Sequence, residues 1–102
     1  MPFTTPYSPE SPPYSSSLAN ERIKVNNHMI EYYNTRINEE NDSILEHFKH
    51  LKECLENSLS SQAVEFWELI ISDCNKKITF HKRNIMEKQY ENFKINEELK
   101  QL

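Results

Sequence analysis

Apolar side chains recur every seven residues from Val64 to Leu102. Numbered in sevens, this stretch has one row made of Val64, Ile71, Ile78, Ile85, Asn92 and Leu99, and a second row made of Trp67, Cys74, His81, Lys88, Ile95 and Leu102. A straight α-helix drifts by about 20° per heptad, so a row that keeps its phase favours a helix supercoiled against a partner helix. The pattern therefore predicts a long helix that belongs to a coiled coil.

An earlier part of the chain carries another apolar row with the same spacing. This row consists of Ile23, Ile30, Ile37, Ile44 and Leu51. Its companion row is mostly polar, whether it is counted three residues on, from Asn26, or four residues on, from Asn27. The face broadens near its end, where the apolar residues are Ile44, Leu45, Phe48, Leu51 and Leu55. This pattern predicts a second long helix with one good apolar row.

A polar segment, residues 57–61 (NSLSS), separates the two patterns. Serine and asparagine side chains compete for nearby backbone groups, and Ser60 or Ser61 can cap the following helix. We therefore expect a helix over 18–56, a loop over 57–61 and a helix over 62–102. Two arms of nearly equal length around a short loop favour an antiparallel helical hairpin. A capping-box pattern at Ser43 and Glu46 offers an alternative break in the first arm, but the seven-residue row crosses it in phase.

Residues 1–17 contain all five prolines of the chain and few bulky side chains. Such a segment buries too little apolar surface to offset the entropy lost on ordering, so we expect a disordered tail. Thr5, Ser8 and Ser11 each precede a proline, which makes them candidate sites of proline-directed phosphorylation. Each phosphate would add about −1.5 to −2 charge to the tail.

The start of the second arm is apolar on nearly every side. Phe66, Trp67 and Ile70 lie there, and a single partner helix cannot cover them all. We therefore expect an all-α hairpin that is completed by further helices in a coiled-coil or bundle assembly, with Trp67 as an anchor. The predicted interface is Ile23, Ile30, Ile37, Ile44, Leu51, Val64, Phe66, Trp67, Ile70, Ile71, Ile78, Ile85, Asn92, Ile95 and Leu99. Asn92 stands among apolar residues, where a polar side chain can fix the register of a coiled coil.

Composition narrows the function classes. The chain has no glycine, which argues against Gly-built phosphate loops and nucleophile elbows, and no catalytic motif is present. We expect a non-enzymatic protein with no cofactor and no small-molecule substrate. His47, His50 and Cys54 have a spacing that zinc sites use, but they are more simply read as helix-surface residues, so we expect no metal. Two cysteines, and no apolar run near about 20 residues, favour a cytoplasmic or nuclear protein without a membrane span.

The one basic cluster runs from Lys76 to Arg83. It suits nucleic acid, but acidic residues lie four positions away from two of its members, Lys77 and Arg83, and the net charge of the chain is −4. We therefore expect protein partners and regard a nucleic-acid- or chromatin-associated factor as the alternative.

The function we predict is a structural or adaptor subunit of a multi-subunit complex. Its general character is that of small subunits in spindle or kinetochore, vesicle-tethering and coactivator complexes, among which the pattern does not distinguish. A further alternative is a homodimeric regulator that presents a phosphorylatable tail.

Overall fold

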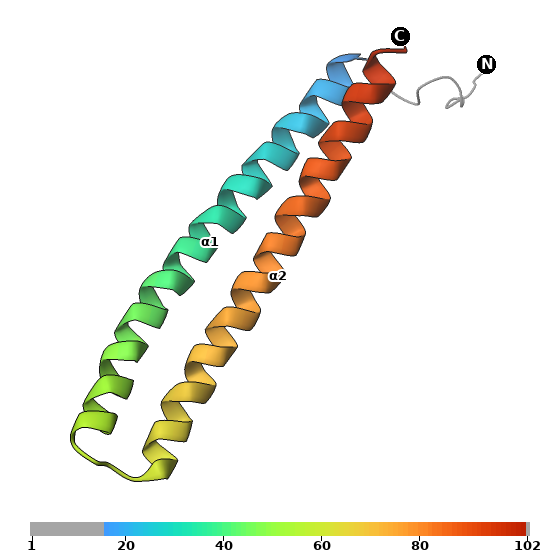
Figure 1. Ribbon diagram of the computed structural model, residues 1–102. Coiled ribbons are helices and arrows are strands. Elements are labelled where there is room, and N and C mark those ends of the chain that lie inside the picture. The colour runs from blue at the N-terminus through green and yellow to red at the C-terminus, as the bar shows by residue number, and fades with distance from the viewer. Residues whose placement is uncertain (1–15, 102) are drawn as a thin grey trace. The chain divides into compact units, whose positions relative to one another are not determined.

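The computed structural model describes residues 16–101, which form two α-helices. Helix α1 spans Ser16–Glu56 and helix α2 spans Ser61–Leu99 (Figure 1). The prediction of an all-α fold with two long antiparallel helices is confirmed. Helix α1 begins two residues before its expected start, and Lys100 and Gln101 follow α2 as a turn. The predicted tail before Ser16, with Thr5, Ser8 and Ser11, lies outside the described residues, as does Leu102.

Helix α1 has no break at the capping-box pattern of Ser43 and Glu46. The helix runs without interruption through this point to Glu56. No proline or glycine interrupts the segment, and Ile37 and Ile44 keep the same face on both sides of it. The second possible break is therefore not used.

The loop is closed at both ends by backbone geometry. Ser58 adopts a left-handed conformation with φ of 53°. The Leu59 amide donates a hydrogen bond to the carbonyl of Cys54 at 3.0 Å, and the Ser58 amide donates one to Leu55 at 3.4 Å. These two bonds form a Schellman motif with a serine where glycine is usual. Ser60 caps α2, since its hydroxyl accepts a hydrogen bond from the Ala63 amide at 3.2 Å.

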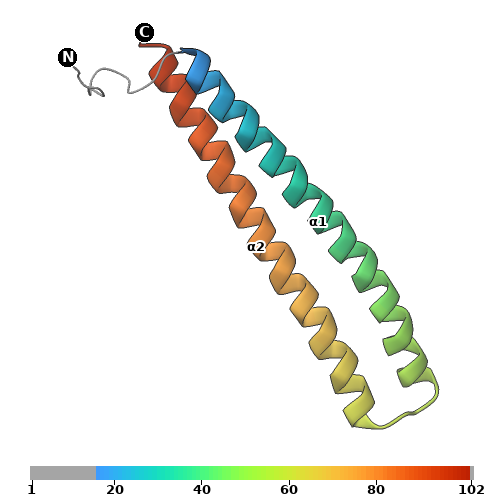
Figure 2. The same ribbon diagram turned by 180° about the vertical axis from the view of Figure 1, so that it is seen from behind.

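The chain forms two compact units. Tyr32–Asn84 form the unit that contains the loop, here called the loop unit. Of the described residues, 16–31 and 85–101 form the other, here called the terminal unit. In the loop unit α1 and α2 run antiparallel on either side of the loop (Figure 1). Within the terminal unit, views from opposite sides both show the two helical segments side by side (Figures 1 and 2).

Ring contacts fix the helix register in the loop unit. Tyr33 packs against His81 with ring centroids 5.8 Å apart, and His47 packs against Trp67 at 5.6 Å. Between these contacts on α2 lie Ile71 and Ile78, which are buried with exposures of 7% and 8%. Apolar layers therefore alternate with polar or aromatic ones.

The terminal unit repeats this alternation. Asn26 donates a hydrogen bond from its side-chain amide to Asn92 at 2.9 Å. The buried apolar side chains of this unit are Ala19, Ile85 and Ile95. Both units thus hold their helices together with β-branched layers separated by polar contacts.

The companion row of α1 is the one counted three residues on. Its members Asn26, Tyr33, Glu40, His47 and Cys54 are all buried or half-buried. The row counted four residues on is exposed from Asn27 to Leu55. The broad apolar face at the end of the first arm is therefore only partly a core face. Leu45, Phe48 and Leu55 point to solvent with exposures of 63%, 49% and 61%.

Candidate functional site

A buried polar contact lies at the centre of the loop unit. Glu40, on α1, is 9% exposed, and its carboxylate accepts a hydrogen bond from the thiol of Cys74, on α2. Burial of the thiol, and secondly the neighbouring Glu40 carboxylate, raise the pKa of Cys74 above its ordinary value of 9.0. Cys74 is therefore a protonated hydrogen-bond donor near neutral pH.

Because of this contact, the free energy of unfolding of the hairpin should vary with pH in the alkaline range. The folded chain binds the Cys74 proton more tightly than the unfolded chain does, so the free energy of unfolding falls as the pH rises above about 9. In Cys74→Ser the hydroxyl does not titrate in this range. We expect the urea midpoint of the wild type to fall more steeply than that of Cys74→Ser between about pH 8 and pH 10.5.

Lys77 also makes the free energy of unfolding fall as the pH rises, and it does so in both the wild type and Cys74→Ser. Its pKa is raised, chiefly because its ammonium donates a hydrogen bond to Asp73, but the group is exposed and present in each chain. The difference between the two urea curves therefore reports Cys74 together with a minor change at Lys77, because Cys74 is the last and smallest of the influences that raise the Lys77 pKa. Parallel curves would show that the Cys74 proton is not linked to folding.

Rings gather next to the loop around Trp67. The ring of His50 stacks on the Trp67 ring at 4.5 Å with an interplanar angle of 17°, and Phe66 meets it edge-on at 5.1 Å. His47 completes the cluster from α1. Nδ1 of His47 is buried and has no hydrogen-bond partner among the described residues. The cluster joins the two helices because the His47 and His50 rings of α1 pack against the Trp67 ring of α2.

In the terminal unit, Asn92 joins two residues of α1. It accepts the hydrogen bond from Asn26, and its own amide donates one to Asn27 at 3.0 Å. Asn26 is 4% exposed, so its amide cannot turn to water if this partner is lost. Asn92 was predicted to fix the helix register, and the structure gives its side chain two hydrogen-bond partners on α1, Asn26 and Asn27.

Asn92→Ala is expected to lower the free energy of unfolding by about 1–3 kcal/mol, because it leaves the Asn26 amide buried and unpaired. The double variant Asn26→Leu with Asn92→Leu should recover most of that loss, since an apolar pair leaves no polar group unsatisfied. Urea denaturation followed by far-UV circular dichroism measures both. A double variant no more stable than Asn92→Ala would contradict the account.

Most of the predicted interface residues face the opposite helix of the same chain. Four of them are buried there: Ile71, Ile78, Ile85 and Ile95. The half-buried ones are Ile23, Ile30, Ile37, Ile44, Leu51, Val64, Trp67, Ile70, Asn92 and Leu99. Phe66 is 55% exposed and points outward. Contact of any of these side chains with another protein stays a prediction.

An exposed apolar face crosses α2 in the loop unit. Leu69 is 71% exposed and stands beside Phe66 and the half-buried Ile70. These three residues border a groove of about 550 Å³, which α1 lines with Glu40, Ser43 and His47 and α2 continues with Asp73, Cys74 and Lys77. We call this surface, made of Phe66, Leu69, Ile70 and the groove, the loop-unit face. Its mixture of apolar and charged side chains suits an amphipathic helix.

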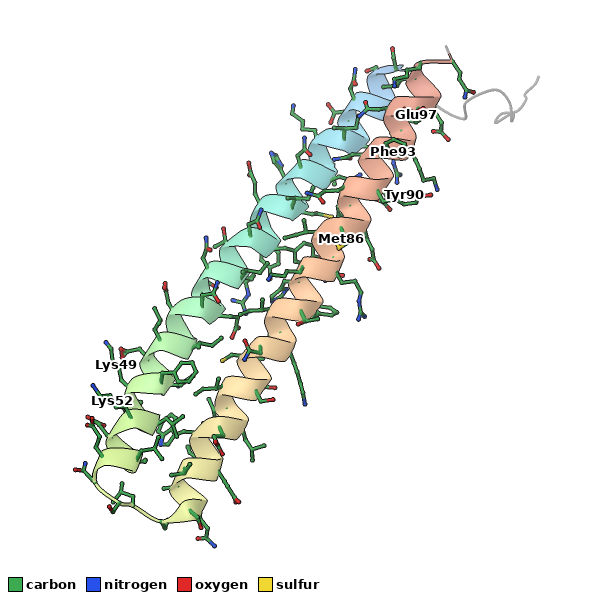
Figure 3. All side chains as sticks on the ribbon, in the orientation of Figure 1. Lys49, Lys52, Met86, Tyr90, Phe93 and Glu97 are labelled. Carbon is green, nitrogen blue, oxygen red and sulfur yellow. The ribbon has the colours of Figure 1, made fainter. Side chains whose placement is uncertain are left out.

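A second exposed row lies on α2 in the terminal unit and was not predicted. Met86, Tyr90 and Phe93 are 68%, 61% and 58% exposed. Figure 3 shows these side chains on α2 on the side away from α1. Their spacing of four and then three residues is a helical stripe, which was the signal available in the sequence.

The basic cluster 76–83 lies on α2 in the loop unit. Lys77 forms an ion pair with Asp73 at 3.3 Å, four residues earlier, as the charge pattern predicted. Phe80, within the cluster, is 56% exposed. The cluster is therefore interrupted by an acidic partner and by an apolar side chain.

Among residues 16–101, no three His, Cys, Asp or Glu side chains lie where they could hold a metal ion. His50 stacks on Trp67, and its Nδ1 lies 3.7 Å from the Glu53 carboxylate. Over the same residues, neither helix has a stretch long and apolar enough to cross a membrane.

Comparison of the chain with protein-family models, with curated proteins and with solved structures found no match.

Proposed function

We propose that this chain is a non-enzymatic interaction subunit whose loop-unit face binds a helix of another protein. The observation that carries the proposal is the exposure of Phe66 (55%) and Leu69 (71%) beside an open groove. Their neighbours Ile71 and Cys74 on the same helix are buried against α1, so the hairpin has used one side of α2 and left the other uncovered. A contiguous apolar face of this kind marks a protein-binding surface.

The groove supplies places for a partner's side chains. An amphipathic helix laid along it would set apolar residues against Phe66, Leu69 and Ile70. The carboxylates of Glu40 and Asp73 and the ammonium of Lys77 line the same groove and would meet the polar flank of that helix. The chain thus acts as a structural or adaptor component that holds a partner helix.

The groove chemistry also supports the non-enzymatic part of the proposal. Cys74 lines the groove, and the thiolate is the reactive form of cysteine. Burial and Glu40 raise the pKa of Cys74, which keeps the thiol protonated near neutral pH. The cysteine is therefore suited to a structural hydrogen bond rather than to catalysis.

Co-purification of the tagged full chain from its native cells tests this function. We compare the wild type with Phe66→Ser/Leu69→Ser, and with the matched control Glu65→Ser/Glu68→Ser, which changes exposed residues in the same turns of α2. The wild type and the control should recover the same protein at a constant ratio. The Phe66/Leu69 variant should recover at least about tenfold less, as expected for losing two central apolar contacts.

The substituted side chains are exposed, so all three proteins should have the same helix content by circular dichroism. Equal recovery of the same protein by the wild type and the Phe66/Leu69 variant would contradict the proposed function.

A further inference from the structure

The outer row of the terminal unit is a second apolar surface, separate from the loop-unit face. Met86, Tyr90 and Phe93 occupy it with exposures of 68%, 61% and 58%. On the opposite side of the same helix, Ile85 and Ile95 are buried against α1. The row therefore adds nothing to the packing of α2 on α1, and another chain can reach it without displacing α1 (Figure 3).

Contacts within the row hold its rings in place. The Tyr90 and Phe93 rings stack with centroids 6.4 Å apart and an interplanar angle of 21°. Nζ of Lys94 lies 5.5 Å from the centroid of the Tyr90 ring. Two stacked rings with a cation at one edge form an ordered apolar strip, which loses little side-chain entropy when it is covered.

The charges beside the row are complementary to themselves when the strip is turned end to end. Met86 and Phe93 are seven residues apart and form one edge of the strip, while Glu87 and Lys94, also seven apart, form the other edge. Tyr90 lies between the edges. Turning the strip end to end about Tyr90 therefore places Met86 over Phe93 and Glu87 over Lys94. An apolar edge then meets an apolar edge, and an acidic residue meets a basic one.

We propose that this row binds a second copy of the chain, with the two α2 helices antiparallel and a two-fold axis at Tyr90. The axis makes each contact occur twice, so the interface holds two Met86–Phe93 contacts and two Glu87–Lys94 ion pairs. A parallel pair, related by an axis along the helices, would instead set the apolar edge of one copy against the charged edge of the other, so that Glu87 and Lys94 would have no opposite charge to meet. The pairing uses no residue of the loop-unit face, so it stands apart from the proposed function.

The expected association is weak. The row offers three large apolar side chains per copy. Such a row buries less area than a standard interface, which buries about 800 Å² per partner. We therefore expect a dimer that forms reversibly with a Kd on the order of 10–100 µM and weakens with salt. The mass of one chain is 12.2 kDa, so a dimer is readily separated from a monomer by sedimentation.

Sedimentation velocity of the full chain, over concentrations on either side of this Kd, tests the pairing through charge swaps. Glu87→Lys leaves two basic residues at the edge of each copy, and Lys94→Glu leaves two acidic ones. Each single variant should dimerise at least about tenfold more weakly than the wild type. An equimolar mixture of the two single variants should dimerise again, because each supplies the charge that the other has lost. The double variant Glu87→Lys/Lys94→Glu should dimerise as the wild type does.

Three results would overturn the proposal. One is a wild type that stays a single chain at every concentration, and another is single variants that dimerise like the wild type. The third is a mixture no more dimeric than either variant alone. Glu87 and Lys94 are exposed, so each variant should keep its helix content by circular dichroism, which separates loss of pairing from loss of folding. None of these results bears on partner recovery through Phe66 and Leu69, so the two proposals fail separately.

Discussion

Ile78→Ala is expected to lower the free energy of unfolding by about 3 kcal/mol. Ile78 is 8% exposed and fills an apolar layer between the Tyr33–His81 contact and the Glu40–Cys74 contact. Removing its branched side chain loses buried apolar surface and leaves a cavity that two helices cannot fully close. Urea denaturation monitored by far-UV circular dichroism measures the change.

The matched control for this substitution is Leu69→Ala. Leu69 lies on the same helix and in the same unit, but it is 71% exposed. Its truncation should change the free energy of unfolding by no more than about 0.5 kcal/mol. Equal losses from the two substitutions would mean that the inward and outward faces of α2 are wrongly assigned.

Trp67→Ala should have the next largest effect and lower the free energy of unfolding by about 2–3 kcal/mol. This loss is smaller than that expected for a fully buried tryptophan, because Trp67 is half-buried. The substitution removes the stacked contact with His50 at 4.5 Å and the contact with His47 at 5.6 Å, which together tie α1 to α2 beside the loop. Urea denaturation followed by circular dichroism is again the measurement, since Trp67 is the sole tryptophan and its fluorescence is lost.

Trp67→Phe is the control, because phenylalanine keeps a ring that can stack on an imidazole. It should retain more than half of the stability lost in Trp67→Ala. A Trp67→Ala protein with the stability of the wild type would show that the ring cluster does not hold the helices together.

The heptad rows predicted the fold because they are a direct statement of which side of α2 is apolar. Ile71, Ile78, Ile85 and Ile95 are all buried, as their positions required. The loop was also predictable, since it needs serine and asparagine chemistry and Ser60 supplies the cap. The left-handed Ser58 was not foreseen, because a chain without glycine must use another residue at that position.

The inward companion row of α1 could not be chosen from hydrophobicity. Its members Asn26 and Glu40 are polar, and they are buried because Asn92 and Cys74 on α2 satisfy them. Conversely, Leu45, Phe48 and Leu55 are apolar and exposed. The hydrophobicity of a side chain indicates that its burial is favourable, but it does not indicate the helix against which the side chain packs.

The candidate surfaces were predicted in part for the same reason. Phe66 and Ile70 were recognised because apolar residues surround that turn of α2 on nearly every side. Met86, Tyr90 and Phe93 were missed because charged residues stand between them and no seven-residue row passes through all three. Their common face becomes evident only when α1 is seen to cover the other side of the helix.

Site-specific photocrosslinking in the native cell tests the central claim most directly. A photoreactive phenylalanine analogue replaces Leu69 in one protein and Asn75, an exposed residue on a different side of α2, in the other. The account predicts that the probe at position 69 is trapped in a covalent adduct with one partner protein, and that the probe at position 75 is not. A chain that stays uncrosslinked at position 69, or that gives the same adducts from both positions, would contradict it.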